Sequence, residues 1–221
     1  MKTITTNNVK ILDHPIISCN LAVIRDKNTD CEKFKNALKR ITYPLIFEAT
    51  KNLPLRDKMV ETPIEKTTCQ VFNSDYQLII APILRAGMIF CEVAQEILPF
   101  ANVHHIGMYR NGETLEPVWY YDKIKEIKED KSKVFVIILD PMIATGNSAN
   151  DSIKNFISKG AKEENITFIS LISSPEGIKT VTNKFSKVKI ITASIDRQLN
   201  SKGYIMPGLG DAGDRIYNTI Q

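Results

Sequence analysis

Residues 134–149 read VFVIILDPMIATGNSA, an apolar run that ends in Asp-Pro and is followed by a small polar loop. The run at 134–139 lacks the polar alternation of a half-solvated strand, which predicts a strand buried on both faces of a parallel sheet. Asp140 then lies at the carboxyl end of that strand, where open α/β sheets bind ligands. This stretch therefore predicts both the fold class and the edge of the sheet that carries the site.

The loop after Asp140 has the composition of a phosphate-binding turn. Residues 144–148 offer closely spaced backbone N–H groups, two hydroxyls and residues that accept positive φ. The spacing of Ile153 and Phe156 predicts a helix behind the loop, ending near Gly160. An acid suits two vicinal hydroxyls and a helix N-terminus suits a phosphate, so a ribose 5-phosphate would satisfy both. The alternative is an incidental turn beside a helix cap.

Strand and helix patterns alternate along the rest of the chain, which favours an α/β fold with a mostly parallel central sheet flanked by helices. Further strands are expected at residues 77–84, 104–110, 166–172 and 188–195. The first of them precedes a helix that ends near Leu98. Residues 31–50 have apolar side chains at helical spacing, with a kink or a break expected at Pro44.

Two segments have no place in the predicted sheet. Residues 61–72 alternate loosely and predict a hairpin. Residues 111–133 are polar and rich in charge, which is the composition of a long loop or an extended arm.

The composition is that of an ordinary soluble globular protein, with 43% hydrophobic and 24% charged residues. The net charge of +4 could favour a polyphosphate ligand but is too weak and dispersed for a nucleic-acid platform. No apolar stretch approaches the roughly 18 residues of a membrane span, and the N-terminus lacks the features of a secretory signal. Four scattered cysteines without Cys-x-x-Cys favour a reduced, cytoplasmic protein.

A second candidate site segment is PILRAG at residues 82–87. Arg85 directly follows a predicted buried strand, and Ala86 and Gly87 let a ligand approach the backbone. A guanidinium there could hold a pyrophosphate through paired, charge-assisted hydrogen bonds. A structural ion pair is an equally good interpretation of Arg85.

A third candidate is GYIMPGLGDAGDR at residues 203–215. Four glycines within eleven residues argue against a helix or a stable strand, and they favour backbone that wraps closely around a ligand. The alternative is a flexible tail, but Ile205, Pro207 and Leu209 would anchor the turns.

Aromatic and histidine residues elsewhere receive simpler interpretations. His104 and His105 are adjacent, so they cannot share one face of a strand, and no third metal ligand accompanies them. Trp119, Tyr120 and Tyr121 could stack on a base, but aromatic clusters more often serve packing.

Together these stretches resemble the uracil phosphoribosyltransferase family, a branch of the type I phosphoribosyltransferases. VIILDPMIATGNSA (136–149) resembles its motif for 5-phosphoribosyl 1-pyrophosphate (PRPP), in which the acid meets the ribose hydroxyls and the Thr-Gly loop takes the 5-phosphate. PILRAG resembles its pyrophosphate loop. Residues 107–121 resemble the mobile loop that closes over the site, and residues 192–196 (TASID) and 203–215 resemble the segments that hold uracil. The GLGDAGD pattern within the last segment is the most specific piece.

The resemblance implies transfer of the 5-phosphoribosyl group from PRPP to uracil, which gives UMP and pyrophosphate in pyrimidine salvage. It implies that the catalytic residues are Arg85, Arg110, Asp140 and Asp211. These four residues would also bind PRPP, together with Pro141, Met142, Ile143, Ala144, Thr145, Gly146, Asn147 and Ser148. The residues implied for uracil are Ile205, Gly210, Asp211 and Ala212.

The resemblance further implies one domain over residues 1–221, with the N-terminal segment and the C-terminal tail forming a hood over the base. It implies Mg²⁺ carried by PRPP without protein ligands of its own, a homo-oligomer, and no nucleic-acid or membrane partner. Asn147 stands where the family usually has a second glycine, and asparagine tolerates left-handed φ. Two other functions stay open: a PRPP- or nucleotide-sensing regulator without turnover, and a transferase for another nucleobase.

Overall fold

The computed structural model describes residues 8–111, 117–127 and 130–219. Within these residues, nine strands form one sheet, in which every neighbouring pair is parallel except β6 and β7. Across the sheet the order is β1 (Val9–Ile11), β11 (Lys189–Ile195), β10 (Ile166–Ser173), β8 (Val134–Leu139), β4 (Gln77–Leu84), β6 (Ile106–Arg110) and β7 (Pro117–Asp122). Two short strands lie off this path: β5 (Asn102–Val103) pairs with β4, and β9 (Met142–Ile143) pairs with β10.

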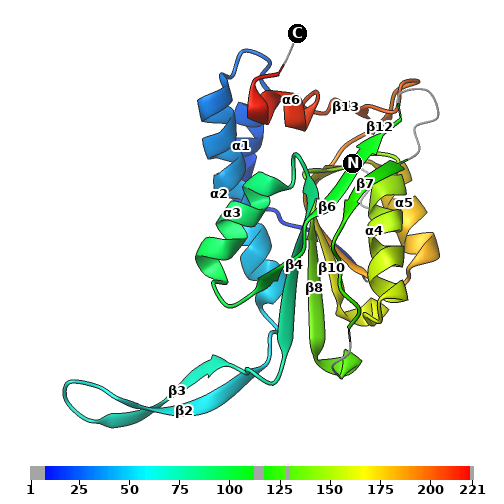
Figure 1. Cartoon of the computed structure of the whole chain (residues 1–221). Coiled ribbons are helices and arrows are strands. Elements are labelled where there is room, and N and C mark those ends of the chain that lie inside the picture. The colour runs from blue at the N-terminus through cyan, green and yellow to red at the C-terminus, as the bar shows by residue number, and fades with distance from the viewer. Residues whose placement is uncertain (1–7, 112–116, 128–129, 220–221) are drawn as a thin grey trace.

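Helices cover both faces of the sheet, as Figure 1 shows. One face carries α1 (Pro15–Arg25), α2 (Cys31–Thr50) and α3 (Met88–Ile97), and the other carries α4 (Asn147–Ser158) and α5 (Pro175–Lys184). Alternate residues of the central strands enter different cores: Leu78 and Ile80 pack with the first group of helices, and Ile79 and Ala81 with the second. Burial on both faces explains the continuous apolar runs, and the predicted α/β class is confirmed.

Helix α2 continues from Cys31 to Thr50 with Pro44 inside it, so of the two outcomes expected at Pro44, a kink or a break, the break is wrong. Proline removes one backbone hydrogen bond of a helix interior. Ile41, Leu45 and Ile46 are fully buried on both sides of the proline. This continuous packing outweighs the local cost, because most helical stability in proteins comes from a buried face.

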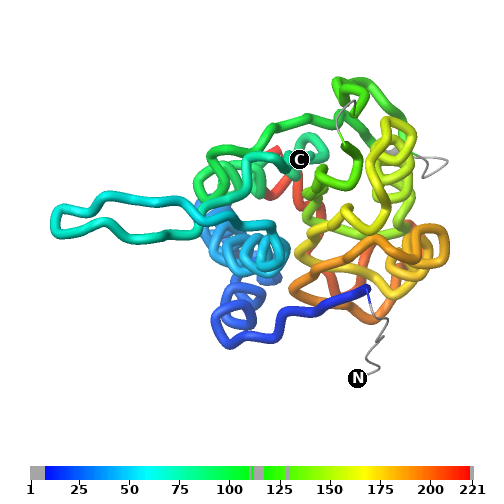
Figure 2. The backbone as a smooth tube through the Cα atoms, turned by 90° about the horizontal axis from the view of Figure 1, so that it is seen from below, coloured from blue at the N-terminus to red at the C-terminus, as the bar shows by residue number. Residues whose placement is uncertain are grey.

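A two-stranded hairpin of β2 (Leu55–Glu61) and β3 (Lys66–Phe72) projects from the body of the molecule (Figure 2). The prediction of a hairpin at 61–72 is confirmed in kind, but the first strand begins six residues earlier. Its polar and exposed residues hid that boundary, since no face of β2 enters the core.

The segment 111–133 is not simply a loop or an arm. Residues Pro117–Asp122 form β7, which pairs antiparallel with β6, and Lys131–Lys133 form a short 3₁₀ turn. A second 3₁₀ turn, Glu163–Asn165, precedes β10. Residues 112–116, within the stretch that resembles a mobile loop, lie outside the described residues.

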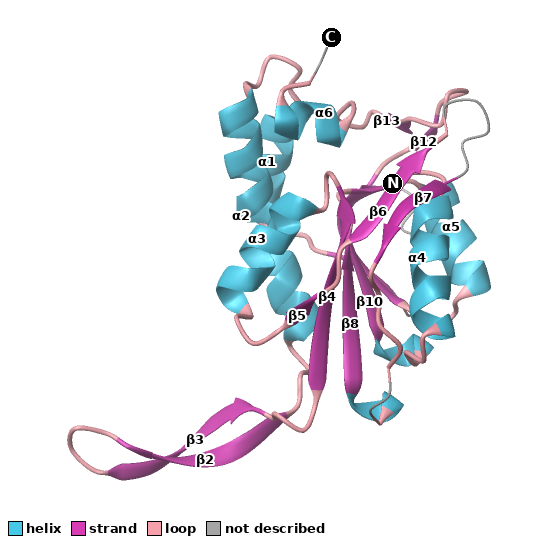
Figure 3. Ribbon diagram, in the orientation of Figure 1, coloured by secondary structure: helices cyan, strands magenta, loops and turns pink. Residues whose placement is uncertain are grey.

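The C-terminal segment runs across the carboxyl edge of the sheet (Figure 3). It contains β13 (Ile205–Met206), paired with β12 (Gln198–Leu199), and the short helix α6 (Ala212–Tyr217). The expectation that its glycines exclude helix and strand is therefore wrong. The predicted anchoring is confirmed for Ile205 and Leu209, which are buried, but not for Pro207, which is exposed.

None of the helices in the described ranges combines the length and the hydropathy that crossing a bilayer requires.

Candidate active site

The loop after β8 is fixed by backbone hydrogen bonds to β10. The N–H of Asp140 donates to the carbonyl of Ile169 (3.2 Å), and the carbonyl of Pro141 accepts from the N–H groups of Leu171 (2.9 Å) and Ile172 (3.1 Å). Asp140 is therefore held at the carboxyl edge of the sheet, as the sequence predicts.

The next turn requires glycine at Gly146, where φ is +86°. A Cβ there would lie 2.7 Å from the carbonyl oxygen of Gly177, at the start of α5. The hydroxyl of Ser174 donates to the carbonyl of Ala144 (2.5 Å), so the N-terminus of α5 supports the loop from behind. Asn147 begins α4 and has no positive φ, so its tolerance of left-handed backbone is not needed.

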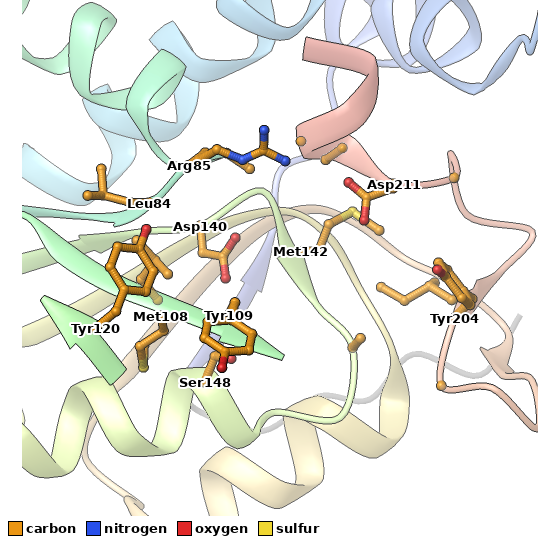
Figure 4. A pocket seen from close by; sticks show the side chains of 18 residues that line it. Leu84, Arg85, Met108, Tyr109, Tyr120, Asp140, Met142, Ser148, Tyr204 and Asp211 are labelled. Atoms are coloured by element: carbon orange, nitrogen blue, oxygen red, sulfur yellow. The ribbon is translucent and has the colours of Figure 1, made fainter. Parts of the chain in front are cut away.

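A cavity of about 430 Å³ opens between the carboxyl ends of β4, β6 and β8 and the C-terminal segment (Figure 4). Four parts of the chain supply its principal lining residues: Leu84 and Arg85; Met108, Tyr109 and Tyr120; Asp140, Met142, Ala144 and Ser148; and Tyr204, Ile205, Gly210, Asp211 and Ala212. Segments far apart in sequence thus meet at the edge where parallel sheets bind ligands.

Most of the predicted site residues gather around this cavity. They are Arg85, Asp140, Met142, Ala144, Ser148, Ile205, Gly210, Asp211 and Ala212. Five predicted PRPP ligands do not line it: Pro141, Ile143, Thr145, Gly146 and Asn147. Pro141 and Ile143 are buried and connect the loop to the sheet. Arg110 ends β6, where its backbone pairs with Pro117, and its side chain is outside the described part of the structure.

Arg85 is only loosely held by its neighbours. One guanidinium nitrogen, Nη2, lies 3.5 Å from Oδ1 of Asp214, and the two side chains are 58% and 40% exposed. The guanidinium also lies 5.6 Å from the ring centre of Tyr217. An exposed, long ion pair contributes little to stability, so this geometry favours a ligand-binding role for Arg85 over a structural one.

Two carboxylates, those of Asp140 and Asp211, line the same cavity (Figure 4). Burial raises the pKa of Asp140 from 3.8 to about 7, and the negative charge of Asp211 adds to this effect. The hydrogen bond from the backbone of Met142 lowers the pKa of Asp140, but by less than burial raises it. The charged form of Asp140 is therefore disfavoured in the free site, and a ligand with hydroxyl donors or an associated cation can stabilise it.

Tyr109 and Tyr120 line the cavity, although the sequence favoured a packing role for the cluster at residues 119–121, to which Tyr120 belongs. Their ring centres lie 6.4 Å apart, and the side chains are 56% and 55% exposed. Gly107 makes room for this arrangement, because a Cβ there would lie 2.7 Å from the Tyr120 ring. The sequence contains the two segments involved, residues 106–110 and the aromatic run at 119–121. Their shared position at the cavity becomes apparent only once β6 and β7 are paired.

Residues 192–196, which resemble a uracil-holding segment, do not reach the cavity. Thr192 is buried, and the side chain of Asp196 is 2% exposed and bonded to Arg25. This segment therefore supports the site from behind.

Solved structures share this architecture. The adenine phosphoribosyltransferase of Leishmania donovani superposes with a TM-score of 0.57 at 13% identity, covering 91% of this chain and 89% of its own, which is a likeness of fold. The AQ2163 protein of Aquifex aeolicus superposes with a TM-score of 0.86 at 36% identity, covering 95% of this chain and 97% of its own. With the acid at the end of β8 and the glycine turn behind it, the chain has the fold of the type I phosphoribosyltransferases.

Sequence relatives specify the branch. A family model described as uracil phosphoribosyltransferase matches residues 11–219. A uracil phosphoribosyltransferase of Fervidobacterium nodosum is 48% identical over 209 residues, covering 95% of this chain and 98% of the relative. One of Dictyoglomus thermophilum is 46% identical over 211 residues, covering 96% and 99%. The chain belongs to the uracil phosphoribosyltransferase family, a family of pentosyltransferases that transfer the phosphoribosyl group of PRPP to uracil.

Proposed function

We propose that this cavity binds PRPP across the ends of β8 and β4 and uracil against residues 205–212, and that it joins them to give UMP and pyrophosphate. One observation carries the proposal: Asp140 and Ser148 of the β8–α4 segment share a single cavity with Arg85 and with the glycine-rich C-terminal segment. A phosphorylated ribose, its leaving group and a base would then lie in contact.

The phosphoribosyl group would be held by Asp140 and by the start of α4. The carboxylate of Asp140 can accept hydrogen bonds from two vicinal ribose hydroxyls. Gly146 caps α4 without a side-chain hydrogen bond of its own, and the Asn147 N–H makes only a long hydrogen bond, 3.4 Å, to the Thr145 hydroxyl, so the first N–H groups of that helix can turn to a ligand. These groups and the helix dipole suit the 5-phosphate. The rest of the loop around the phosphoribosyl group would be formed by Met142, Ala144, Thr145 and Asn147.

Arg85 and Arg110 would bind the pyrophosphate and disperse the charge that develops as it leaves. Glycosyl transfer passes through an oxocarbenium-like state, which needs positioning and charge stabilisation more than a strong nucleophile. The loose contact between Arg85 and Asp214 leaves the guanidinium able to pair with phosphate oxygens.

Mg²⁺ fits this site as a companion of PRPP. Magnesium is commonly bound through one or two carboxylates together with substrate phosphates. Asp140 and Asp211 offer two carboxylates in one cavity, where burial and, to a smaller extent, the charge of Asp211 raise the pKa of Asp140. In the described ranges, no group of three or more His, Cys, Asp or Glu could hold a metal by itself. Bound with PRPP, the ion would neutralise phosphate charge.

Uracil would be selected by backbone atoms of the C-terminal segment. Uracil presents an acceptor, O4, beside a donor, N3–H, and peptide groups of Ile205, Gly210 and Ala212 can offer the complementary pair. Cytosine reverses this pattern and would leave backbone groups unpaired. Asp211, which belongs to the same turn, would lie near both substrates.

We further propose that residues 1–221 form one domain, with the N-terminal segment and the C-terminal tail as a hood, and that the protein is a cytoplasmic homo-oligomer, a dimer or larger. All four cysteines are free, which suits a reducing compartment. Exposed apolar side chains on the projecting hairpin (Leu55, Met59 and Ile64) favour association between copies. Light scattering coupled to size-exclusion chromatography would measure the mass in solution, and a monomer would contradict the oligomer.

The decisive experiment incubates the protein with PRPP, Mg²⁺ and each nucleobase in turn, and measures pyrophosphate release and nucleotide formation. UMP from uracil alone is the expected result. Nucleotide from a different base would make the protein a transferase for that base. Binding of PRPP with no product from any base would make it a sensor without turnover.

A further inference from the structure

The backbone of Gly208 is hydrogen-bonded at both its N–H and its carbonyl by one ion pair, in which Asp196 is buried and Arg25 is 25% exposed. Oδ2 of Asp196 accepts a hydrogen bond from the Gly208 N–H (2.8 Å), and Nη1 of Arg25 donates to the Gly208 carbonyl (2.9 Å). Arg25 also forms a two-pronged pair with Asp196, with distances of 2.8 and 2.5 Å. The Ser194 hydroxyl completes the cluster, 3.1 Å from Arg25 Nη2 and 3.0 Å from Asp196 Oδ1.

The next peptide is held by a second arginine, Arg215 of α6. Its Nη1 donates to the carbonyl of Leu209 (2.8 Å) and to the carbonyl of Ile24 (2.5 Å), and its Nη2 donates to the carbonyl of Asp26 (2.6 Å). The guanidinium is buried and lies 4.3 Å from the ring centre of Phe34. Consecutive residues of the C-terminal segment are thus tied to the end of α1.

The proposed reading of uracil uses backbone atoms of Ile205, Gly210 and Ala212, which no rotamer can adjust. Their positions depend on the path of the chain between them. That path includes a left-handed Gly208 (φ +64°), where a Cβ would collide with the Ile205 carbonyl. A tight turn with this geometry needs external bonds to hold it in one conformation.

Neither Arg25, Asp196 nor Arg215 lines the active-site cavity, so none of them can read the base directly. Burial alone would raise the pKa of Asp196, but the hydrogen bonds from Arg25 and Gly208 outweigh it and lower that pKa. Asp196 is therefore charged at neutral pH, and the pair bonds the N–H and the carbonyl of Gly208 at once.

We propose that Arg25 and Asp196, assisted by Arg215, are positioning residues that set the backbone of the base-binding turn and thereby the affinity and selectivity for the nucleobase. The inference rests on the proposed placement of uracil against residues 205–212. It assigns the segment at 192–196 an indirect role in base recognition, through Gly208.

The test is a kinetic comparison of Arg25→Lys with the unmodified enzyme, at saturating Mg²⁺. Lysine keeps the charge beside Asp196 but cannot bond Asp196, Ser194 and the Gly208 carbonyl together, because it lacks the guanidinium fork. A displaced turn should raise KM for uracil roughly tenfold to 100-fold, while KM for PRPP changes less than about twofold. Discrimination against cytosine should fall as well.

Arg40→Lys makes the same chemical change on the exposed face of α2 and should leave all constants unchanged. If Arg25→Lys does not fold, Ser194→Ala removes only the hydroxyl bonded to both partners and should raise KM for uracil by a smaller factor. Equal changes in both KM values, or a lower kcat with unchanged KM values, would overturn the proposal. Absence of uracil turnover in the unmodified enzyme would instead refute the proposed function, so the two failures are distinguishable.

Discussion

Replacing Asp140 by asparagine should make the free protein more stable and the enzyme less active. Burial raises the pKa of Asp140 from 3.8 to about 7, so the charged form of this carboxyl group destabilises the folded state. Each pKa unit corresponds to about 1.36 kcal/mol, which sets a ceiling of about 4 kcal/mol on the gain from removing this charge. The cavity is open to water, which reduces the expected gain to about 1–2 kcal/mol.

The pH dependence follows from proton binding. Between pH 3.8 and about 7 the folded protein retains a proton on Asp140 that the unfolded chain has lost, so the free energy of unfolding falls as pH rises through this window. Asparagine has no such dependence. The melting temperatures of Asp140→Asn and of the unmodified protein should therefore converge near the lower end of this window and separate above its upper end, by about 2–8 °C for a chain of this size.

Activity should change in the opposite direction. Loss of the carboxylate that accepts the ribose hydroxyls should weaken transition-state binding by roughly 1.5–3 kcal/mol, which lowers kcat/KM for PRPP roughly 10- to 150-fold. Thermal melts across pH, combined with a pyrophosphate-release assay, measure both quantities. Asp57→Asn, the same change on the exposed hairpin, should alter neither. Unchanged kcat/KM together with a lower melting temperature would refute the assignment of Asp140.

Three further predictions test other parts of the site. Arg85→Lys should lower kcat/KM for PRPP roughly tenfold or more, because a point charge replaces a fork; its loose pair with Asp214 is worth at most about 1 kcal/mol, so a large fall in melting temperature would favour the structural interpretation. Gly146→Ala should cost about 1–3 kcal/mol in a denaturant titration, since φ is +86° and the Gly177 carbonyl is close; an unchanged midpoint would contradict the geometry. Cytosine should react with a kcat/KM about 10⁴ below that of uracil, and comparable turnover of both bases would refute backbone readout by the C-terminal turn.

The parts of the fold that were predictable are those whose local pattern and burial agree. The strands at 77–84 and 134–139 are buried on both faces, so an uninterrupted apolar run marks all of the second strand and all but Gln77 of the first. The acid and glycine that follow the second strand mark the ligand edge directly, because parallel strands all present their carboxyl ends there.

The parts that were not predictable depend on contacts between distant segments. Tyr120 enters the cavity because β7 pairs with β6 at the edge of the sheet, which no local pattern reveals. The helix continues through Pro44 because Ile41, Leu45 and Ile46, on both sides of it, are buried in the core. The first strand of the hairpin has no buried face, so its sequence shows no alternation of apolar and polar residues that would predict a strand.

The clearest case is a pair of acids that look alike in the sequence. Asp140 and Asp196 each directly follow a buried parallel strand, so the local sequence pattern predicts a place in the site equally well for both. In the structure Arg25, 171 residues away in sequence, reaches Asp196, lowers its pKa and makes it part of the framework. In the described part of the chain no ion pair involves Asp140, and burial raises its pKa to about 7. Burial disfavours the charged form of Asp140 in the free protein, and a ligand that donates hydrogen bonds to this carboxylate would stabilise that form on binding.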